Sequence, residues 1–334
     1  MNTPLLELKQ VSKRFEKKLD LAGKLARALG ANLREETVHA VDLVDLTINE
    51  GEVVGLVGES GCGKSTLGRV VVGLHRQSAG EKLWRGKNVA TMTPTEKRAM
   101  NLEAQMIFQD PYASLNPRFR VEDIIGEAPV VHGLIEAKQK NAYVADIMQQ
   151  VGLDAALSRR FPHQFSGGQR ARIGIARALA VRPKFLVCDE AVAALDVSIQ
   201  AQVLNLFITL REQLNLTYLF ISHDLGVVRH VSDRVVIMYL GRVVESAPTE
   251  TLFTRPNHPY TQGLLAEVPT LTAQKKTFVA IKGEIPSPLN PPSGCHFHPR
   301  CPHAASVPGN KCAREQPPLK AIGSNHFSAC HLNT

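Results

Sequence analysis

The sequence predicts an α/β fold with a mainly parallel sheet, and three observations carry this prediction. Apolar runs of strand length alternate with helical patterns through residues 5–245, which is typical of parallel sheets covered by helices. A glycine-rich stretch at 58–66 lies between an apolar run at 53–57 and a helical pattern from 67. Two later apolar runs, at 185–188 and 218–221, end directly on acidic or histidine side chains. Such side chains meet at the carboxyl edge of a parallel sheet, where we expect the functional site.

The composition is that of a globular protein that acts inside the cell. The chain has 334 residues, of which 44% are hydrophobic and 21% charged, and no run of 18 apolar residues could span a bilayer. The amino-terminal segment lacks a basic start with a long apolar stretch, so we expect no secretion signal and a cytoplasmic location. The net charge of +8 is compatible with nucleotide binding or a nearby membrane. The chain has no dense block of Lys and Arg and only 5% aromatic residues, which argues against nucleic-acid binding.

The first third of the chain predicts three strands and one insertion. Strands are expected at 5–11, 38–48 and 53–57, and a turn at 49–51 leads into the third. Segment 16–39 interrupts the pattern, and its leucines at every fourth position predict a short amphipathic helix. A surface insertion is the favoured interpretation of that helix, and a membrane-facing role is the alternative. Residues 76–98 are polar and turn-rich, and a short apolar run follows at 104–108.

The remaining elements follow from periodicity and from helix-breaking residues. Prolines 111 and 117 frame a non-helical segment at 110–118, and residues 121–157 are expected to be helical, with Gly152 as a helix end. Helices are expected at 170–180 and 198–214, strands at 185–188 and 218–221, and a hairpin from 235–239 and 242–245. From 246 prolines become frequent and four cysteines follow. We therefore place a domain boundary near 246 and interpret 246–334 as an appended module.

The stretch at 58–66 matches the G-x-x-x-x-G-K-[ST] pattern of a phosphate-binding loop, in its required strand–turn–helix context. Backbone N–H groups of such a loop and the positive end of the following helix hold β- and γ-phosphates. Lys64 would reach the β/γ oxygens, and the Ser65 hydroxyl would bind Mg²⁺. The candidate nucleotide-binding residues here are Gly58, Ser60, Gly61, Cys62, Gly63, Lys64, Ser65 and Thr66.

Three side chains at strand ends are candidates for the chemistry. Asp189 ends the strand at 185–188 and would bind Mg²⁺ opposite Ser65, while Glu190 would act as general base toward water. His223 follows the strand at 218–221 and would bridge the γ-phosphate and that water. An acidic turn or a lone histidine at a strand end is usually structural. The phosphate loop and the parallel topology, which bring these residues to one edge, favour the catalytic interpretation.

A second anion nest, Ser166-Gly167-Gly168, precedes a strong helical pattern. One ATP needs only one phosphate loop, so this nest predicts contact with a nucleotide held by a partner subunit.

Together these motifs resemble an ABC transporter ATPase subunit over residues 5–245. The loop at 58–66 matches Walker A, 185–190 Walker B, 165–169 the signature, and 194–196 the D-loop, with Gln109 in the Q-loop and His223 as the switch histidine. The resemblance implies a P-loop NTPase (RecA-like) core with an antiparallel β subdomain and a helical subdomain at about 110–182. Phe165 replaces the usual signature leucine, and Ala191 replaces a proline, which is expected to loosen the turn at Glu190.

The resemblance also implies roles for individual residues. Glu190, His223, Lys64 and Gln109 would be catalytic, and Ser65, Gln109 and Asp189 would hold Mg²⁺. Beyond the loop, the implied ATP contacts are Phe15 (against adenine), Gln109, Asp189, Ser166, Gly167, Gly168, Gln169 and Asp196.

The same resemblance implies partners. Two ATPase subunits would sandwich two ATPs head to tail, with a heterodimer favoured, beneath two transmembrane permease subunits at the cytoplasmic face of a bacterial inner membrane. Residues 109–118 would contact a permease, and an extracytoplasmic solute-binding protein would act indirectly.

A finer resemblance is to the dipeptide/oligopeptide branch, whose relatives include nickel and glutathione systems. It is carried by segments 108–118, 258–261, 286–292 and 299–302. The tail cysteines follow the spacing C-x5-C-x10-C-x17-C, and clustered thiols in a reducing compartment favour metal. Zinc and no metal remain alternatives, while the resemblance implies a [4Fe–4S] cluster. Its ligands would be Cys295, Cys301, Cys312 and Cys330.

Two other functions compete with an importer ATPase. A soluble ABC ATPase acting on nucleic acid or ribosomes usually carries two ATPase halves, and this chain has one phosphate loop and one signature. A module that binds ATP without hydrolysis would need to lack Glu190 or His223, and both are present.

Overall fold

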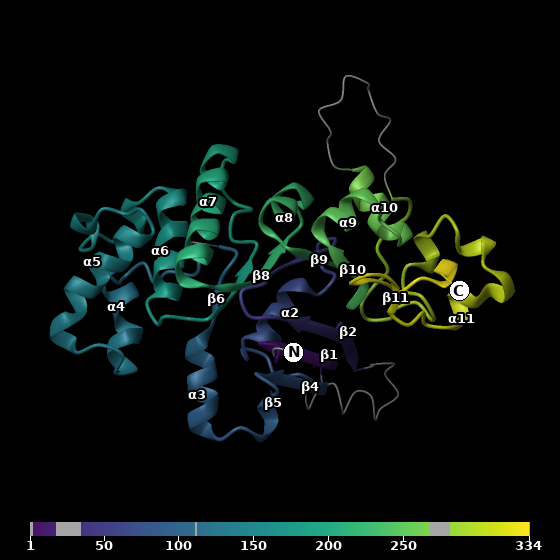
Figure 1. The fold of residues 1–334 in the computed structure, drawn as a ribbon, viewed down its shortest axis with the longest axis horizontal. Coiled ribbons are helices and arrows are strands. Elements are labelled where there is room, and N and C mark those ends of the chain that lie inside the picture. The colour runs from purple at the N-terminus through teal and green to yellow at the C-terminus, as the bar shows by residue number, and fades with distance from the viewer. Residues whose placement is uncertain (1–2, 18–34, 111, 268–280, 334) are drawn as a thin grey trace, which may run out of the picture.

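The computed structural model describes residues 3–17, 35–110, 112–267 and 281–333. A mixed sheet of eight strands forms the centre, in the order β11-β12-β10-β9-β3-β8-β7-β6 (Figure 1). The five strands from β9 to the β6 edge are parallel, which confirms the α/β prediction. They are β6 (Ala104–Ile107), β7 (Phe185–Asp189), β8 (Thr217–Ser222), β3 (Val53–Val57) and β9 (Arg234–Tyr239).

Burial explains why these short apolar runs form strands. Every residue of β3, β7 and β8 is buried, as expected for parallel strands covered on both faces. Helices α2 (Lys64–Val71), α7 (Val197–Leu214) and α8 (Leu225–Val231) connect the strands. Their apolar faces join two large core clusters, one on each side of the sheet. The carboxyl ends of β3, β7 and β8 consequently lie side by side.

A second, antiparallel sheet has the order β2-β1-β4-β5. It consists of β1 (Leu6–Lys17), β2 (Glu36–Ile48), β4 (Ala79–Trp84) and β5 (Lys87–Asn88). The interpretation of 76–98 as turns is wrong, because β4, β5 and the start of helix α3 (Pro94–Glu103) lie there. Pairing of β4 with β1 makes a strand from a polar segment that has no alternating pattern of its own. The helix expected within 16–39 lies largely outside the described residues.

Three helices form a lobe at one end of the molecule: α4 (Val121–Val131), α5 (Lys140–Gln150) and α6 (Gly167–Leu179) (Figure 1). The helical region expected over 121–157 is interrupted after Val131, where Gly133 adopts a φ of 70°. Gly152 ends the second helix, also with a φ of 70°. Apolar residues of these helices share one core with β7 and β8, so the lobe is anchored to the central sheet.

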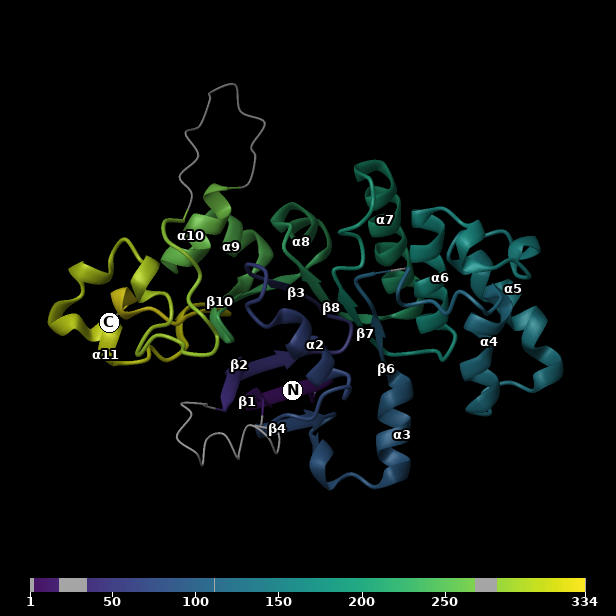
Figure 2. The ribbon, with the colours of Figure 1, turned by 180° about the vertical axis from the view of Figure 1, so that it is seen from behind.

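The segment from 246 onward packs at the opposite end of the molecule (Figure 2). Strand β10 (Arg242–Pro248) continues through residue 246 and pairs with β12 (His326–Ser328), which pairs with β11 (Lys320–Gly323). The helices here are α9 (Thr249–Thr254), α10 (Pro259–Ala266) and α11 (Lys311–Arg314). The extension therefore adds two strands to the main sheet.

Short 3₁₀ turns complete the description: η1 (Val89–Thr91), η2 (Ala137–Gln139), η3 (Ala155–Leu157), η4 (Pro162–Gln164), η5 (His298–Arg300), η6 (Ala304–Ser306), η7 (Pro308–Asn310) and η8 (His331–Asn333). Within the described ranges no helix has the length and apolar character that crossing a bilayer requires.

Candidate nucleotide-binding site

The loop at 58–66 connects β3 to α2. At two of its glycines the neighbouring backbone is so close that no side chain would fit. A Cβ on Gly58 would lie 2.1 Å from the Met238 carbonyl oxygen, and one on Gly63 would lie 2.0 Å from the Ala40 carbonyl oxygen. Gly63 also has a φ of 103°, a left-handed conformation that favours glycine. These contacts hold the loop in its curled shape at the end of β3.

Lys64 is almost fully buried, at 4% exposure, and its ammonium lies across its own loop. Its Nζ donates to the carbonyl oxygens of Gly58, at 2.6 Å, and Glu59, at 3.0 Å. The positive charge therefore sits within the curve of the loop, where the phosphate groups of a nucleotide would lie.

Ser65 and Asp189 meet across the edge of the sheet. The Ser65 hydroxyl donates to Asp189 Oδ1 at 2.7 Å. Asp189 is 1% exposed, and burial raises the pKa of its carboxyl, an effect that the bond from Ser65 partly offsets. A hydroxyl and a dehydrated carboxylate are hard oxygen donors, and a cation would compensate the buried charge. These two residues fit a Mg²⁺ site.

Glu190, Gln109 and His223 come together beside that pair. Gln109 Nε2 donates to Glu190 Oε2 at 2.7 Å, and His223 Nδ1 lies 3.5 Å from Glu190 Oε1. Glu190 has a φ of 48°, and its N–H donates to the Ile221 carbonyl at 3.0 Å. The turn expected to be loosened by Ala191 is thus hydrogen-bonded at Glu190. One carboxylate faces an amide and an imidazole at the open edge of the sheet.

The signature residues lie on another element. Ser166 and Gln169 form a reciprocal capping box at the start of α6, and a Cβ on Gly168 would meet the Ile199 side chain at 2.4 Å. In the described part of the chain, no hydrogen bond or ion pair joins this segment to the loop at 58–66. Asp196 precedes α7 as its N-terminal residue, without a side-chain cap bond. The second nest is therefore not brought to this chain's own loop.

Phe15 lies near the end of β1 with 38% of its surface exposed. Its ring makes an edge contact with His75, at a centroid distance of 5.4 Å, and lies 4.8 Å from the Lys13 ammonium. One face of the ring is thus supported by the protein, while enough remains exposed for stacking with a base.

The structure adds contacts to the loop that sequence reasoning missed. Arg300, from the extension, binds the Glu59 carboxylate with two hydrogen bonds of 2.7 and 3.0 Å. The Glu59 N–H donates to the Tyr260 hydroxyl at 2.9 Å. The one signal in the sequence was Glu59, because a carboxylate within a phosphate loop needs a cationic partner. The sequence does not show which Lys or Arg is that partner.

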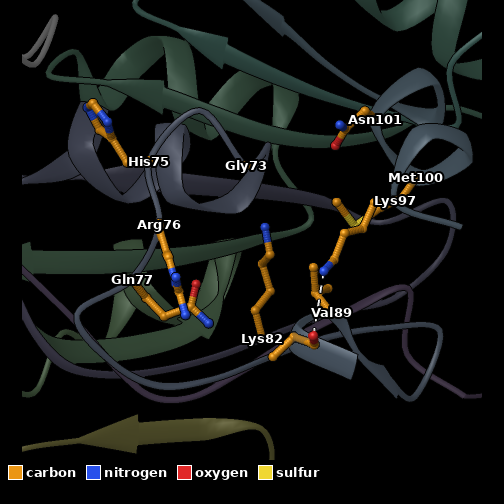
Figure 3. A pocket seen from close by; sticks show the side chains of 10 residues that line it. Gly73, His75, Arg76, Gln77, Lys82, Val89, Lys97, Met100 and Asn101 are labelled. Atoms are coloured by element: carbon orange, nitrogen blue, oxygen red, sulfur yellow. Dashed lines mark hydrogen bonds between the residues drawn. The ribbon is translucent and has the colours of Figure 1, made fainter. Parts of the chain in front are cut away.

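A hollow of about 370 Å³ lies at the far end of α2, away from the loop (Figure 3). Lys82 points into it, and its Nζ donates to the Val70 and Val71 carbonyls at 3.0 and 3.2 Å. Burial lowers the pKa of Lys82 to about 8. The folded state thus disfavours the charged amine, and this penalty is full below pH 8 and vanishes above the unfolded pKa near 10.5.

The Lys82→Met variant is expected to remove this pH dependence. The quantity to compare is the free energy of unfolding of the variant minus that of the parent. This difference should be about 2 kcal/mol larger at pH 7.5 than at pH 9.5, because the parent loses its burial penalty as pH rises. Urea denaturation of both proteins at the two pH values measures this difference. If the variant and the parent differ by the same free energy at pH 7.5 and pH 9.5, the folded-state pKa of Lys82 is not lowered.

The four cysteines of the extension are free thiols, and none is fully exposed. Burial raises the pKa of each, to about 11 for Cys295. Among the residues that the structure describes, no group of three or more His, Cys, Asp or Glu side chains is arranged to hold a metal ion. The structure therefore gives no support to the predicted [4Fe–4S] cluster.

Comparison with known proteins agrees with this geometry. Residues 41–193 match a family described as ABC transporter, and residues 244–307 one described as the C-terminal region of oligopeptide/dipeptide transporters. Protein YkfD of Bacillus subtilis strain 168 is 47% identical over 333 residues, covering 98% of this chain and 95% of its own length. Oligopeptide transport ATP-binding protein AppF of the same strain is 46% identical over 332 residues, covering 98% and 97%.

A solved structure shows the same fold. The dimeric, post-hydrolysis ATP-binding cassette MJ0796 bound to ADP and Pi has a TM-score of 0.61 and 25% sequence identity, covering 73% of this chain and 98% of that chain.

Proposed function

This chain belongs to the ATP-binding subunits of ABC transporters, and from that premise we propose that it hydrolyses ATP to drive uptake of di- or oligopeptides through a membrane permease. The observation that carries the ATPase assignment is the arrangement at the carboxyl edge of the sheet. Glu190 faces Gln109 and His223 there, next to the Ser65–Asp189 pair.

In the proposed reaction, Lys64 and the N–H groups of the loop bind the β- and γ-phosphates, and Phe15 stacks on adenine. Ser65 and Asp189, with Gln109, would hold Mg²⁺, which supplies charge neutralisation at the phosphate oxygens.

Glu190 accepts a proton from the attacking water, while Gln109 and His223 orient the carboxylate and that water. The water oxygen bonds to the γ-phosphorus as the bond to the ADP oxygen breaks, which gives ADP and phosphate.

A complete site is proposed to need two ATPase subunits. Support comes from the signature segment at 165–169, which lies at the start of α6 and, within the described residues, makes no hydrogen bond or ion pair with the loop at 58–66. In a head-to-tail dimer, Ser166, Gly167, Gly168 and Gln169 would bind the γ-phosphate of the partner's ATP, with Asp196 at the same interface. We propose a related second ATPase as the partner.

The peptide cargo is inferred from similarity. AppF is named for oligopeptide transport, and the match at 244–307 is to a region named for oligopeptide/dipeptide transporters. Nickel, glutathione or another small solute is the alternative, because the permease and a binding protein select the solute. We further propose that residues 109–118 contact the permease pair, and that the subunit is peripheral at the cytoplasmic face of a bacterial inner membrane.

The division of the chain at residue 246 also remains a proposal: an ATPase domain at 1–245, with a helical subdomain at about 110–182, and an extension at 246–334. The composition shift supports it, although β10 continues through the boundary and pairs with β12.

The [4Fe–4S] cluster implied by the resemblance is likewise a proposal. Its support is that the thiol of Cys295 lies within electrostatic reach of the other three. Against it, the described residues contain no group of three or more His, Cys, Asp or Glu side chains arranged to hold a metal ion. Iron analysis and absorbance near 400 nm of anaerobically purified protein test it. Iron with a brown colour lost in Cys301→Ser supports the cluster, and iron-free, colourless protein rejects it.

Phosphate release tests the proposed function. We would measure it for the subunit alone, and again after co-expression with permease subunits and a second ATPase. Activity that appears only on assembly supports a transporter subunit with shared sites. Full activity alone favours a self-sufficient homodimer, and ATP binding without release in any assembly contradicts the ATPase assignment. Peptide-stimulated release in reconstituted vesicles, with nickel and glutathione as comparisons, tests the cargo.

A further inference from the structure

One residue of the phosphate loop is bound from two sides. The Glu59 carboxylate accepts two hydrogen bonds from Arg300, at 2.7 and 3.0 Å, and the Glu59 N–H donates to Tyr260 at 2.9 Å. The Glu59 carbonyl oxygen accepts from Lys64 Nζ at 3.0 Å. A single residue therefore joins the extension directly to the lysine that would bind phosphate.

The extension holds this contact on a rigid base. The Arg300 side chain is 5% exposed and that of Glu59 24% exposed. Tyr239, Tyr260 and Phe297 are fully buried and pack edge to face or tilted against one another, with centroid distances of 4.7 to 5.3 Å. Arg300 lies over this cluster, 5.8 Å from the Tyr239 ring centroid. A planar guanidinium in two parallel hydrogen bonds, supported by packed rings, fixes the position of its partner.

Charge gives the contact its importance for nucleotide binding. A carboxylate in a loop that binds phosphates repels the ligand unless a cation neutralises it. Arg300 supplies that cation and directs the Glu59 side chain toward the extension. It also leaves the Glu59 main-chain oxygen available to Lys64. Without Arg300, an unpaired anion would remain within the phosphate loop.

We propose that Arg300 is a positioning residue for ATP binding, through which the extension sets the shape and charge of the phosphate loop. The proposal rests on the proposed function in that the loop must bind MgATP. Titration of the parent chain with MgATP tests that premise separately, so a failure there is distinguishable from a failure of the role of Arg300.

The test is a double-mutant cycle on the full chain, with the Kd for MgATP as the readout. Arg300→Met should raise the Kd by about 10-fold or more, because it leaves the Glu59 carboxylate unpaired beside the phosphates. Glu59→Gln should stay within about 3-fold of the parent, since it removes the repelling charge. The double variant should return to within about 3-fold of Glu59→Gln.

Recovery in the double variant separates a positioning role from a merely structural one. If Arg300 acted only by holding the extension together, the double variant would bind as weakly as Arg300→Met, and that result would overturn the proposal. An Arg300→Met Kd equal to the parent value would do the same. If Arg300→Met does not fold, Arg300→Lys decides. It retains the charge but not the two-pronged geometry, so a rise in Kd of about 5-fold is expected, beyond the margin allowed for Glu59→Gln, and a Kd within that margin contradicts the proposal.

Arg234→Met is the matched control. Arg234 pairs with Glu52 at 2.7 Å, with exposures of 21% and 15%, at the start of β3 rather than at its loop end. This variant also breaks a half-buried Arg–Glu pair, so it should lower stability while leaving the Kd for MgATP unchanged. A matching loss of affinity in Arg234→Met would show that general destabilisation explains the effect.

Discussion

The Glu190→Gln variant is expected to bind MgATP with near-parent affinity and to hydrolyse it about 10²- to 10⁴-fold more slowly. The amide has the shape of the carboxylate but cannot accept a proton from water. It can still accept the hydrogen bond from Gln109, which is 2.7 Å long in the parent. The left-handed φ of 48° at Glu190 does not depend on the side-chain charge. The closed dimer should therefore form with ATP and persist.

Single-turnover phosphate release measures the loss of hydrolysis, and the size of the protein in the presence of ATP shows whether the closed dimer persists. Glu52→Gln is a suitable control, because Glu52 also lies next to a strand of the central sheet. It precedes β3, at the amino end of that strand, and pairs with Arg234 away from the site. It should hydrolyse ATP at the parent rate. Hydrolysis at the parent rate by Glu190→Gln would instead exclude Glu190 as the general base.

Lys64→Met is expected to raise the Kd for MgATP by at least about 30-fold and to abolish measurable hydrolysis at ordinary ATP concentrations. The ammonium is buried and directed into the curve of the loop, where it binds the carbonyls of Gly58 and Glu59. Methionine has a similar length but offers no charge to the phosphates. Equilibrium titration with MgATP measures the loss.

Lys82→Met makes the same chemical change elsewhere. Lys82 is also buried, at 3% exposure, and also donates to two backbone carbonyls, those of Val70 and Val71. Its variant should bind MgATP like the parent. Equal losses in both variants would attribute the Lys64 effect to stability, and parent-like binding by Lys64→Met would remove Lys64 from the site.

The sequence predicted the central sheet well because its strands are short, continuous apolar runs between clear turns. It failed at 76–98, where β4 contains Gly80, Glu81 and Lys82 and owes its conformation to pairing with β1. No local pattern reports that pairing, because the partner strand lies far away in the chain.

The candidate site shows the same division. The strand ends of one parallel sheet predict that Glu190 and His223 lie at the same edge, and the family resemblance adds Gln109. The structure brings all three together. The Arg300–Glu59 pair joins residues 241 positions apart. Its position depends on how the extension packs against β9, which local sequence does not encode.

The pairing of β10 with β12 has a consequence during protein synthesis. One side of strand β10 pairs with β9 in a hairpin, and its other side pairs with residues 327 and 328 of β12 and accepts a hydrogen bond from Ala329. Those residues leave the ribosome long after the ATPase core has emerged and had time to collapse. Until then, β10 presents a row of unsatisfied backbone groups to any other nascent chain. Truncation or translational arrest within the extension should therefore produce aggregated protein rather than a shorter, working ATPase.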